Sequence, residues 1–135
     1  MNENINYNQE KTPPHFVSLI IQRLISIYKF WLEIQDHIPK KSRYTLFEKI
    51  DLRFLETIEL ALAANYLSKE QKLSYLQKAV HKLDVLKFLL QIAWETKNLD
   101  NKKYIILSEK LNEIGRMLGG WIKGIIKTNS ARSGE

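Results

Sequence analysis

Cysteine is absent from this chain of 135 residues, which excludes disulfide bonds and thiolate metal sites and is typical of a cytoplasmic protein. Proline is rare, and the three prolines all lie before residue 40. No uninterrupted apolar run approaches the roughly 18 residues of a membrane span, and the polar residues 1–11 lack the pattern of a signal peptide. These absences predict one soluble, cytoplasmic domain that does not bind a membrane.

Charge is plentiful and unevenly distributed. The formal net charge is +6, from 21 lysines and arginines and 15 aspartates and glutamates. Residues 44–66 carry two basic and four acidic groups, whereas residues 67–98 carry six against three and residues 99–135 carry seven against four. A basic surface attracts phosphate backbones or acidic partners. The alternative is that the charge only keeps a small protein soluble.

Apolar residues recur at alternating three- and four-residue steps in four separate stretches, which predicts four amphipathic helices. The first seam runs from Phe16 to Ile38, with Thr12 as the expected N-cap and Pro39 as the stop. The second helix is expected at about residues 45–65.

Short connections separate the remaining helices. Ser68 and Gln71 form a capping-box pattern at the start of the third helix, which is expected to end near Lys97. Asp100 is the expected cap of the fourth helix.

Four such helices joined by short loops, with no strand-like alternation, predict an all-α fold. We expect an up-down-up-down antiparallel four-helix bundle over residues 13–127. Residues 1–12 and 128–135 are expected to be flexible tails.

The sequence lacks the patterns of the chemistry that a helical bundle can host. A di-iron carboxylate centre needs Glu-x-x-His pairs, and none of the three histidines has a glutamate three residues before it. Neither a known nucleophile motif nor a glycine-rich phosphate loop is present. We therefore expect no catalytic residue, metal or cofactor, and predict that the protein is not an enzyme.

Basic side chains on the third and fourth helices are candidates for binding nucleic acid. Those of the third helix are expected near one side, and those of the fourth helix align by steps of seven and four residues. Acidic groups come early and basic groups late on the fourth helix, so a solvated face matched to the helix dipole is the alternative. Arg116 could instead pair with Glu113 or with a carboxylate on another subunit. The candidate residues are Lys72, Lys78, Lys82, Arg116, Lys123 and Lys127.

Four glycines lie inside the fourth helix, although each costs about 1 kcal/mol relative to alanine there. They form two G-x-x-x-G pairs, and a four-residue step leaves a groove for a neighbouring helix. A tryptophan in the same segment is expected in the core or an interface rather than as a base-stacking platform. The residues predicted to pack helices or subunits are Gly115, Gly119, Gly120, Trp121 and Gly124.

The fourth helix is apolar over more than one face, because Ile105, Ile106, Ile122 and Ile126 widen its seam. A helix of this kind generally has a second partner. In a single bundle that partner would be another subunit, so we expect a homo-oligomer.

Residues 113–121, Glu-Ile-Gly-Arg-Met-Leu-Gly-Gly-Trp, resemble the C-terminal signature of the Avd-like family. This family comprises the accessory variability determinant proteins of diversity-generating retroelements. Residues 82–91 resemble the third helix of the family, and the likeness spans residues 16–127. The resemblance implies a four-helix bundle that assembles into a ring-like pentamer, binds nucleic acid and partners a reverse transcriptase.

The function implied by this resemblance is that of a non-enzymatic accessory protein. Such a protein would bind reverse transcriptase and RNA or DNA, without sequence preference, to support mutagenic cDNA synthesis. Two alternatives stay open. One is the related type of four-helix protein encoded within intervening sequences of large-subunit ribosomal RNA genes, and the other is a protein–protein scaffold that binds no nucleic acid.

Overall fold

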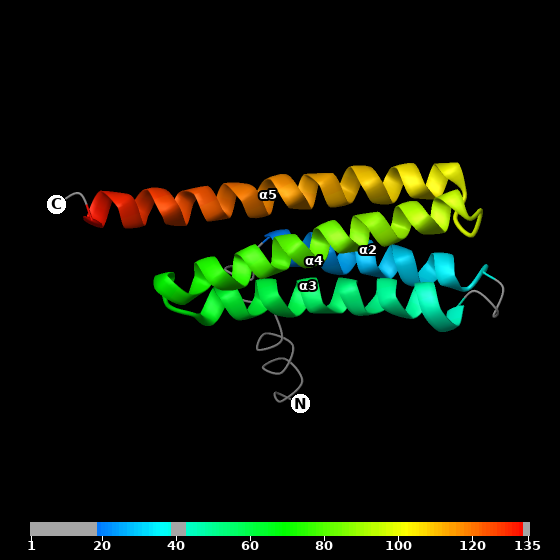
Figure 1. The fold of residues 1–135 in the computed structure, drawn as a ribbon, viewed down its shortest axis with the longest axis horizontal. Helices are drawn as coiled ribbons and strands as arrows, with labels where there is room; N and C mark the ends of the chain where they lie inside the picture. Colours follow the sequence, from blue (N-terminus) through cyan, green and yellow to red (C-terminus); the bar gives the residue numbers. More distant parts are fainter. Residues whose placement is uncertain (1–18, 39–42, 134–135) are drawn as a thin grey trace, which may run out of the picture.

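Four α-helices and no strand make up the residues that the computed structural model describes, 19–38 and 43–133. The helices are α2 (Leu19–Gln35), α3 (Glu48–Tyr66), α4 (Lys69–Glu95) and α5 (Asn101–Ser133), and a π-helical turn, η2 (Arg43–Phe47), leads into α3. Successive helices run antiparallel, and each packs against two others: α3 and α5 both contact α2 and α4 (Figure 1). This arrangement confirms the predicted four-helix bundle.

The core follows the apolar seams that the sequence predicts, although Val80 of the third seam is only partly buried and its neighbour Ala79 is buried instead. Two predicted boundary residues of the first helix, Thr12 and Pro39, and its first seam residue, Phe16, lie outside the described residues. The most deeply buried seam residues include Leu24, Trp31, Ile50, Phe54, Leu76, Leu83, Leu86, Leu90, Leu107, Leu111, Ile114 and Leu118.

Aromatic stacking and a shared carboxylate join α2 to α3. The ring of Trp31 lies 5.0 Å from that of Phe47 and 6.3 Å from that of Phe54. Its Nε1 donates a hydrogen bond of 2.8 Å to Asp51, which also accepts one of 2.7 Å from Gln35. Trp31 is therefore a core residue whose only polar atom has a partner, as burial of tryptophan requires.

Helix ends match the predicted caps only in part. Asp100 accepts a hydrogen bond of 2.8 Å from the backbone N–H of Lys103, which confirms it as the cap of α5. Ser68 occupies the N-cap position of α4, but its side chain makes no capping bond, so the predicted capping box is wrong. The backbone carbonyl of Ser68 accepts instead from the N–H groups of Gln71 and Lys72.

The helix α5 extends beyond residue 127, where the bundle was expected to end. No proline or glycine falls within residues 125–133 to stop it, and the Thr128 hydroxyl bonds the Gly124 carbonyl at 2.9 Å. At 1.5 Å per residue, α5 is ~50 Å long and α4 ~40 Å. The end of α5 therefore projects past the turn between α3 and α4 (Figure 1).

Candidate nucleic-acid interface

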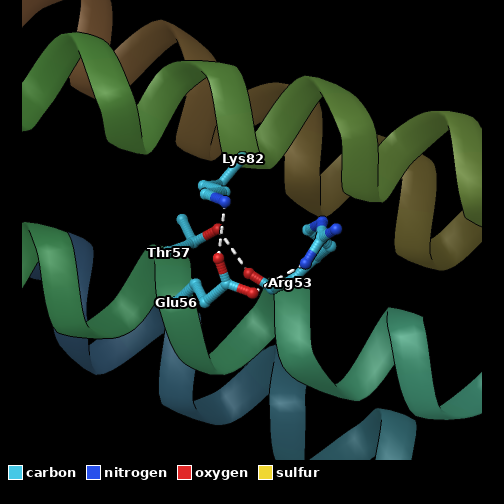
Figure 2. Close-up of polar contacts among 4 residues, drawn as sticks. All are labelled: Arg53, Glu56, Thr57 and Lys82. Carbon is cyan, nitrogen blue, oxygen red and sulfur yellow. Dashed lines mark hydrogen bonds and ion pairs between the residues drawn. The ribbon is translucent and has the colours of Figure 1, made fainter.

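Lys82, a predicted nucleic-acid-binding residue, is held in an ion pair within the bundle. Its Nζ lies 2.6 Å from Oε2 of Glu56 on α3, and Nη1 of Arg53 lies 2.7 Å from the other oxygen of the same carboxylate (Figure 2). A paired lysine attracts phosphate less than a free one, because the carboxylate cancels much of its charge. The ion pair gives Lys82 a contact that joins α4 to α3, and its binding of nucleic acid stays a prediction.

The same contacts change the acidity of Glu56. The hydrogen bond from Lys82 lowers the pKa of this carboxyl, partial burial opposes that effect, and the charge of Arg53 adds to it. Glu56 is therefore ionised wherever the bundle is folded near neutral pH, and the ion pair persists there.

Lys78 lies one turn before Lys82 and is exposed. Its Nζ sits 5.4 Å from the centre of the Tyr75 ring, a contact that leaves the ammonium group in water. No carboxylate among the described residues pairs with it. Lys78 is therefore available to a ligand, unlike Lys82.

The sequence predicted Lys72 near the same side of α4 as Lys78 and Lys82. The structure places it on a different side. Steps of six and ten residues leave side chains about 120° and 80° apart on an α-helix. Lys72 lies instead beside α5, where it lines a cleft with Trp121 and Gly124. The predicted cations of α4 thus belong to two surfaces.

Arg116, Lys123 and Lys127 are exposed on α5, on the side away from its buried seam. None of the three pairs with a carboxylate among the described residues. Glu113, the alternative partner of Arg116, pairs with Arg23 of α2 instead. Residues 114–133 hold four basic groups and no acidic group, so the C-terminal half of α5 is a basic surface.

The glycines of α5 are not explained by close contacts within the chain. A Cβ at Gly115 would lie 3.4 Å from Nζ of Lys87, which is near an ordinary contact distance, whereas a Cβ at Gly119, Gly120 or Gly124 would have nothing from the described chain within 4 Å. No described helix of the same bundle therefore fills a groove at these three glycines. Packing against another molecule stays a prediction.

Lys69 is a further candidate residue, which no sequence pattern had singled out. It lines the cleft that contains Lys72, Trp121 and Gly124. The sequence did contain one indication of such a site. Lys69 and Lys72 both lie in the first turn of a helix, where the helix macrodipole disfavours cations, so helix stability does not explain their presence there. Trp121, predicted in the core or an interface, is half-buried and packs against the core.

The part of the chain covered by the structure contains no group of three histidine, aspartate or glutamate side chains that could hold a metal ion. None of its helices is long and apolar enough to cross a membrane.

Fold and surface together define a four-helix bundle protein with a basic end where α4 begins and α5 terminates. A family model described as bAvd-like matches residues 18–125. The chain therefore belongs to the bAvd-like family, which confirms the resemblance seen in the sequence. A comparison with curated proteins finds no match.

Proposed function

We propose that this protein is a non-enzymatic accessory of a diversity-generating retroelement, acting in the cytoplasm. In this role it binds the reverse transcriptase and RNA or DNA, and supports mutagenic cDNA synthesis. Family membership supports the accessory role. The observation that carries nucleic-acid binding is the exposed, unpaired set of cations on α5, Arg116, Lys123 and Lys127.

These cations suit contact with a phosphate backbone rather than with base edges. The helix rise places Lys123 and Lys127 ~6 Å apart along α5, and Arg116 lies ~10 Å from Lys123 toward the start of the helix. Lysine and arginine contacts to phosphates release counterions, so affinity should fall with salt by a slope of about −0.7 per phosphate for a single strand. Three contacts in each subunit would give a slope of about −2. Such binding carries no sequence preference.

An exposed apolar face on α3 supports assembly into a homo-oligomer. Leu52, Leu55, Leu62 and Tyr66 are between 39% and 67% exposed and recur on the side of α3 opposite its buried seam. Exposed apolar patches of this kind mark protein interfaces. On α5, Ile105 is also exposed, in keeping with a second partner for that helix. A ring of five follows only from the resemblance to the family.

The test is binding of the purified protein to a labelled RNA–DNA hybrid across a salt series, with the mass measured by light scattering. Replacing Arg116, Lys123 and Lys127 together by glutamine should weaken binding at least tenfold and flatten the salt dependence. The matched control replaces Lys102, Lys103 and Lys110 on the N-terminal half of α5, which changes the net charge equally.

An equal loss in both variants would contradict the assigned surface. If the unaltered protein does not bind the hybrid at low salt, nucleic acid has no part in the function and a protein–protein scaffold is the better account.

A further inference from the structure

A cleft of about 280 Å³ lies at the basic end of the bundle, between the start of α4 and the C-terminal part of α5. It is comparable to the lower limit of about 300 Å³ for pockets that enclose small-molecule ligands, so it has room for one small group. The cleft is lined by Lys69, Lys72, Trp121, Gly124, Ile125 and Thr128.

The charge of this cleft is not balanced by the described residues. Neither Lys69 nor Lys72 pairs with a carboxylate of the described residues. Glu70, the acidic residue in the first turn of α4, is not part of the lining. Two ammonium groups therefore converge on a hollow without a counter-charge, an arrangement that attracts an anion.

The opposite wall of the cleft offers a flat aromatic surface. Trp121 packs against the core, which fixes the ring, yet it is only half-buried and also borders the cleft. Gly124 keeps the space open, because a Cβ there would meet nothing from the described chain within 4 Å. A planar group can therefore reach the tryptophan ring.

A larger hollow of about 550 Å³ at the other end of the bundle lacks these properties. Two lysines line it, Lys97 and Lys103, but Asp100 also belongs to the lining and lies 3.6 Å from Lys103, so the positive charge is partly cancelled. Its tryptophan, Trp94, already stacks on Tyr104 at 4.9 Å and donates a hydrogen bond to Asn101. A lining without an acidic residue and a tryptophan with no aromatic stacking partner among the described residues coincide only in the smaller of these two hollows.

We propose that the smaller cleft binds one unpaired nucleotide of a single strand, with the base against Trp121 and its phosphate between Lys69 and Lys72. This inference rests on the proposed function and adds a preference for single strands over duplexes. A base inside a duplex is stacked on its neighbours and cannot enter the cleft, whereas every unpaired base has a face that can stack on an aromatic ring. From the cleft, the strand would continue along the outer side of α5 past Lys127 and Lys123.

The test compares two neutral substitutions in the full chain. Gly124→Leu fills the cleft, and Gly120→Leu is the matched control, because Gly120 is also open but does not line the cleft. Affinities are measured for a labelled 12-nucleotide single-stranded RNA and for an RNA–DNA hybrid duplex of equal length. We expect Gly124→Leu to lower the affinity for the single strand about fivefold or more, and that for the duplex less than twofold.

The ratio of the two affinities is the deciding quantity, because a change in assembly alters binding of both probes together. Gly120→Leu should leave this ratio unchanged. Trp121→Phe should retain the preference for the single strand and Trp121→Leu should lose it, while Lys69→Gln should weaken single-strand binding. Helicity measured by circular dichroism shows that each variant folds.

A ratio in Gly124→Leu equal to that of the unaltered protein would overturn the cleft proposal and leave the proposed function standing. A wild-type protein that binds both probes equally would overturn it as well. Failure of the unaltered protein to bind either probe at low salt would instead refute the proposed function on which the inference rests.

Discussion

Replacing Lys82 by glutamine should destabilise the bundle while leaving nucleic-acid affinity nearly unchanged. Lys82 bridges α4 to Glu56 on α3, so its removal breaks a contact between helices. Lys78, one turn away, is exposed and pairs with no described carboxylate. Lys78→Gln should therefore lower affinity and leave stability within about 0.5 kcal/mol of the wild type. The two variants have the same net charge, which makes each the control for the other.

The magnitude follows from the exposure of the pair. The side chains of Lys82 and Glu56 are 32% and 30% exposed, so solvent screens their attraction. Exposed ion pairs contribute about 0.2–1 kcal/mol, and this less exposed pair should lie near the upper end of that range. A loss of about 1 kcal/mol would lower the Tm of a domain of this size by roughly 3–5 °C. Arg53 still pairs with Glu56 in the variant, which limits the loss.

The pH dependence of this contribution has a definite sign. The pKa of Glu56 is lowered in the folded protein, mainly by the hydrogen bond from Lys82. The contribution is therefore fully present above the pKa of the unfolded state, about 4.3, and is lost as the pH falls through the lower pKa of the folded state. The stability difference between the wild type and Glu56→Gln should shrink below about pH 4.

Denaturant unfolding of the wild type, Lys82→Gln, Glu56→Gln and the double variant gives the coupling energy directly. We expect about 0.5–1 kcal/mol at pH 7. A coupling near zero would show that the ion pair does not stabilise the bundle. A tenfold loss of hybrid affinity in Lys82→Gln, with unchanged stability, would return Lys82 to the nucleic-acid surface and refute its assignment here.

Two further variants test the core and the surface of α3. Trp31→Phe should lower the free energy of unfolding by about 2 kcal/mol, because it leaves a void and removes the hydrogen bond to Asp51; a change below about 0.5 kcal/mol in denaturant unfolding would contradict this. Leu55→Glu with Leu62→Glu should reduce the mass measured by light scattering while helicity persists, because both leucines are exposed on α3. An unchanged mass would place the subunit contact elsewhere.

Periodicity predicted the fold well because burial in a bundle depends on spacing within each helix. Leu83, Leu86 and Leu90 are buried where the seam of the third helix placed them. The Asp100 cap is equally local, since its partner lies three residues away. Features that need only one helix and its immediate neighbours were therefore accessible from sequence.

The candidate site was predicted less well because its properties depend on contacts between helices. The spacing of Lys78 and Lys82 cannot show that Glu56, on another helix, pairs with only one of them. Likewise, the flank of α4 that carries Lys72 became part of a cleft only when α5 packed beside it. Sequence identified most of the cations, and the packing of the helices decides which of them are free.

The glycines of α5 give the strongest reason to look for ligands outside the single chain. Each glycine in a helix interior lowers stability by about 1 kcal/mol relative to alanine. At three of the four positions, an added Cβ would contact no atom of the described chain within 4 Å. Stability of the isolated bundle would therefore favour alanine at these positions. Gly124 borders the cationic cleft, whereas Gly119 and Gly120 lie beside Arg116 and Lys123 on the outer side of α5. Since no described residue of the bundle requires the missing side chains, we expect the close approach that they permit to serve a partner: a nucleotide at Gly124 and another subunit at Gly119 and Gly120.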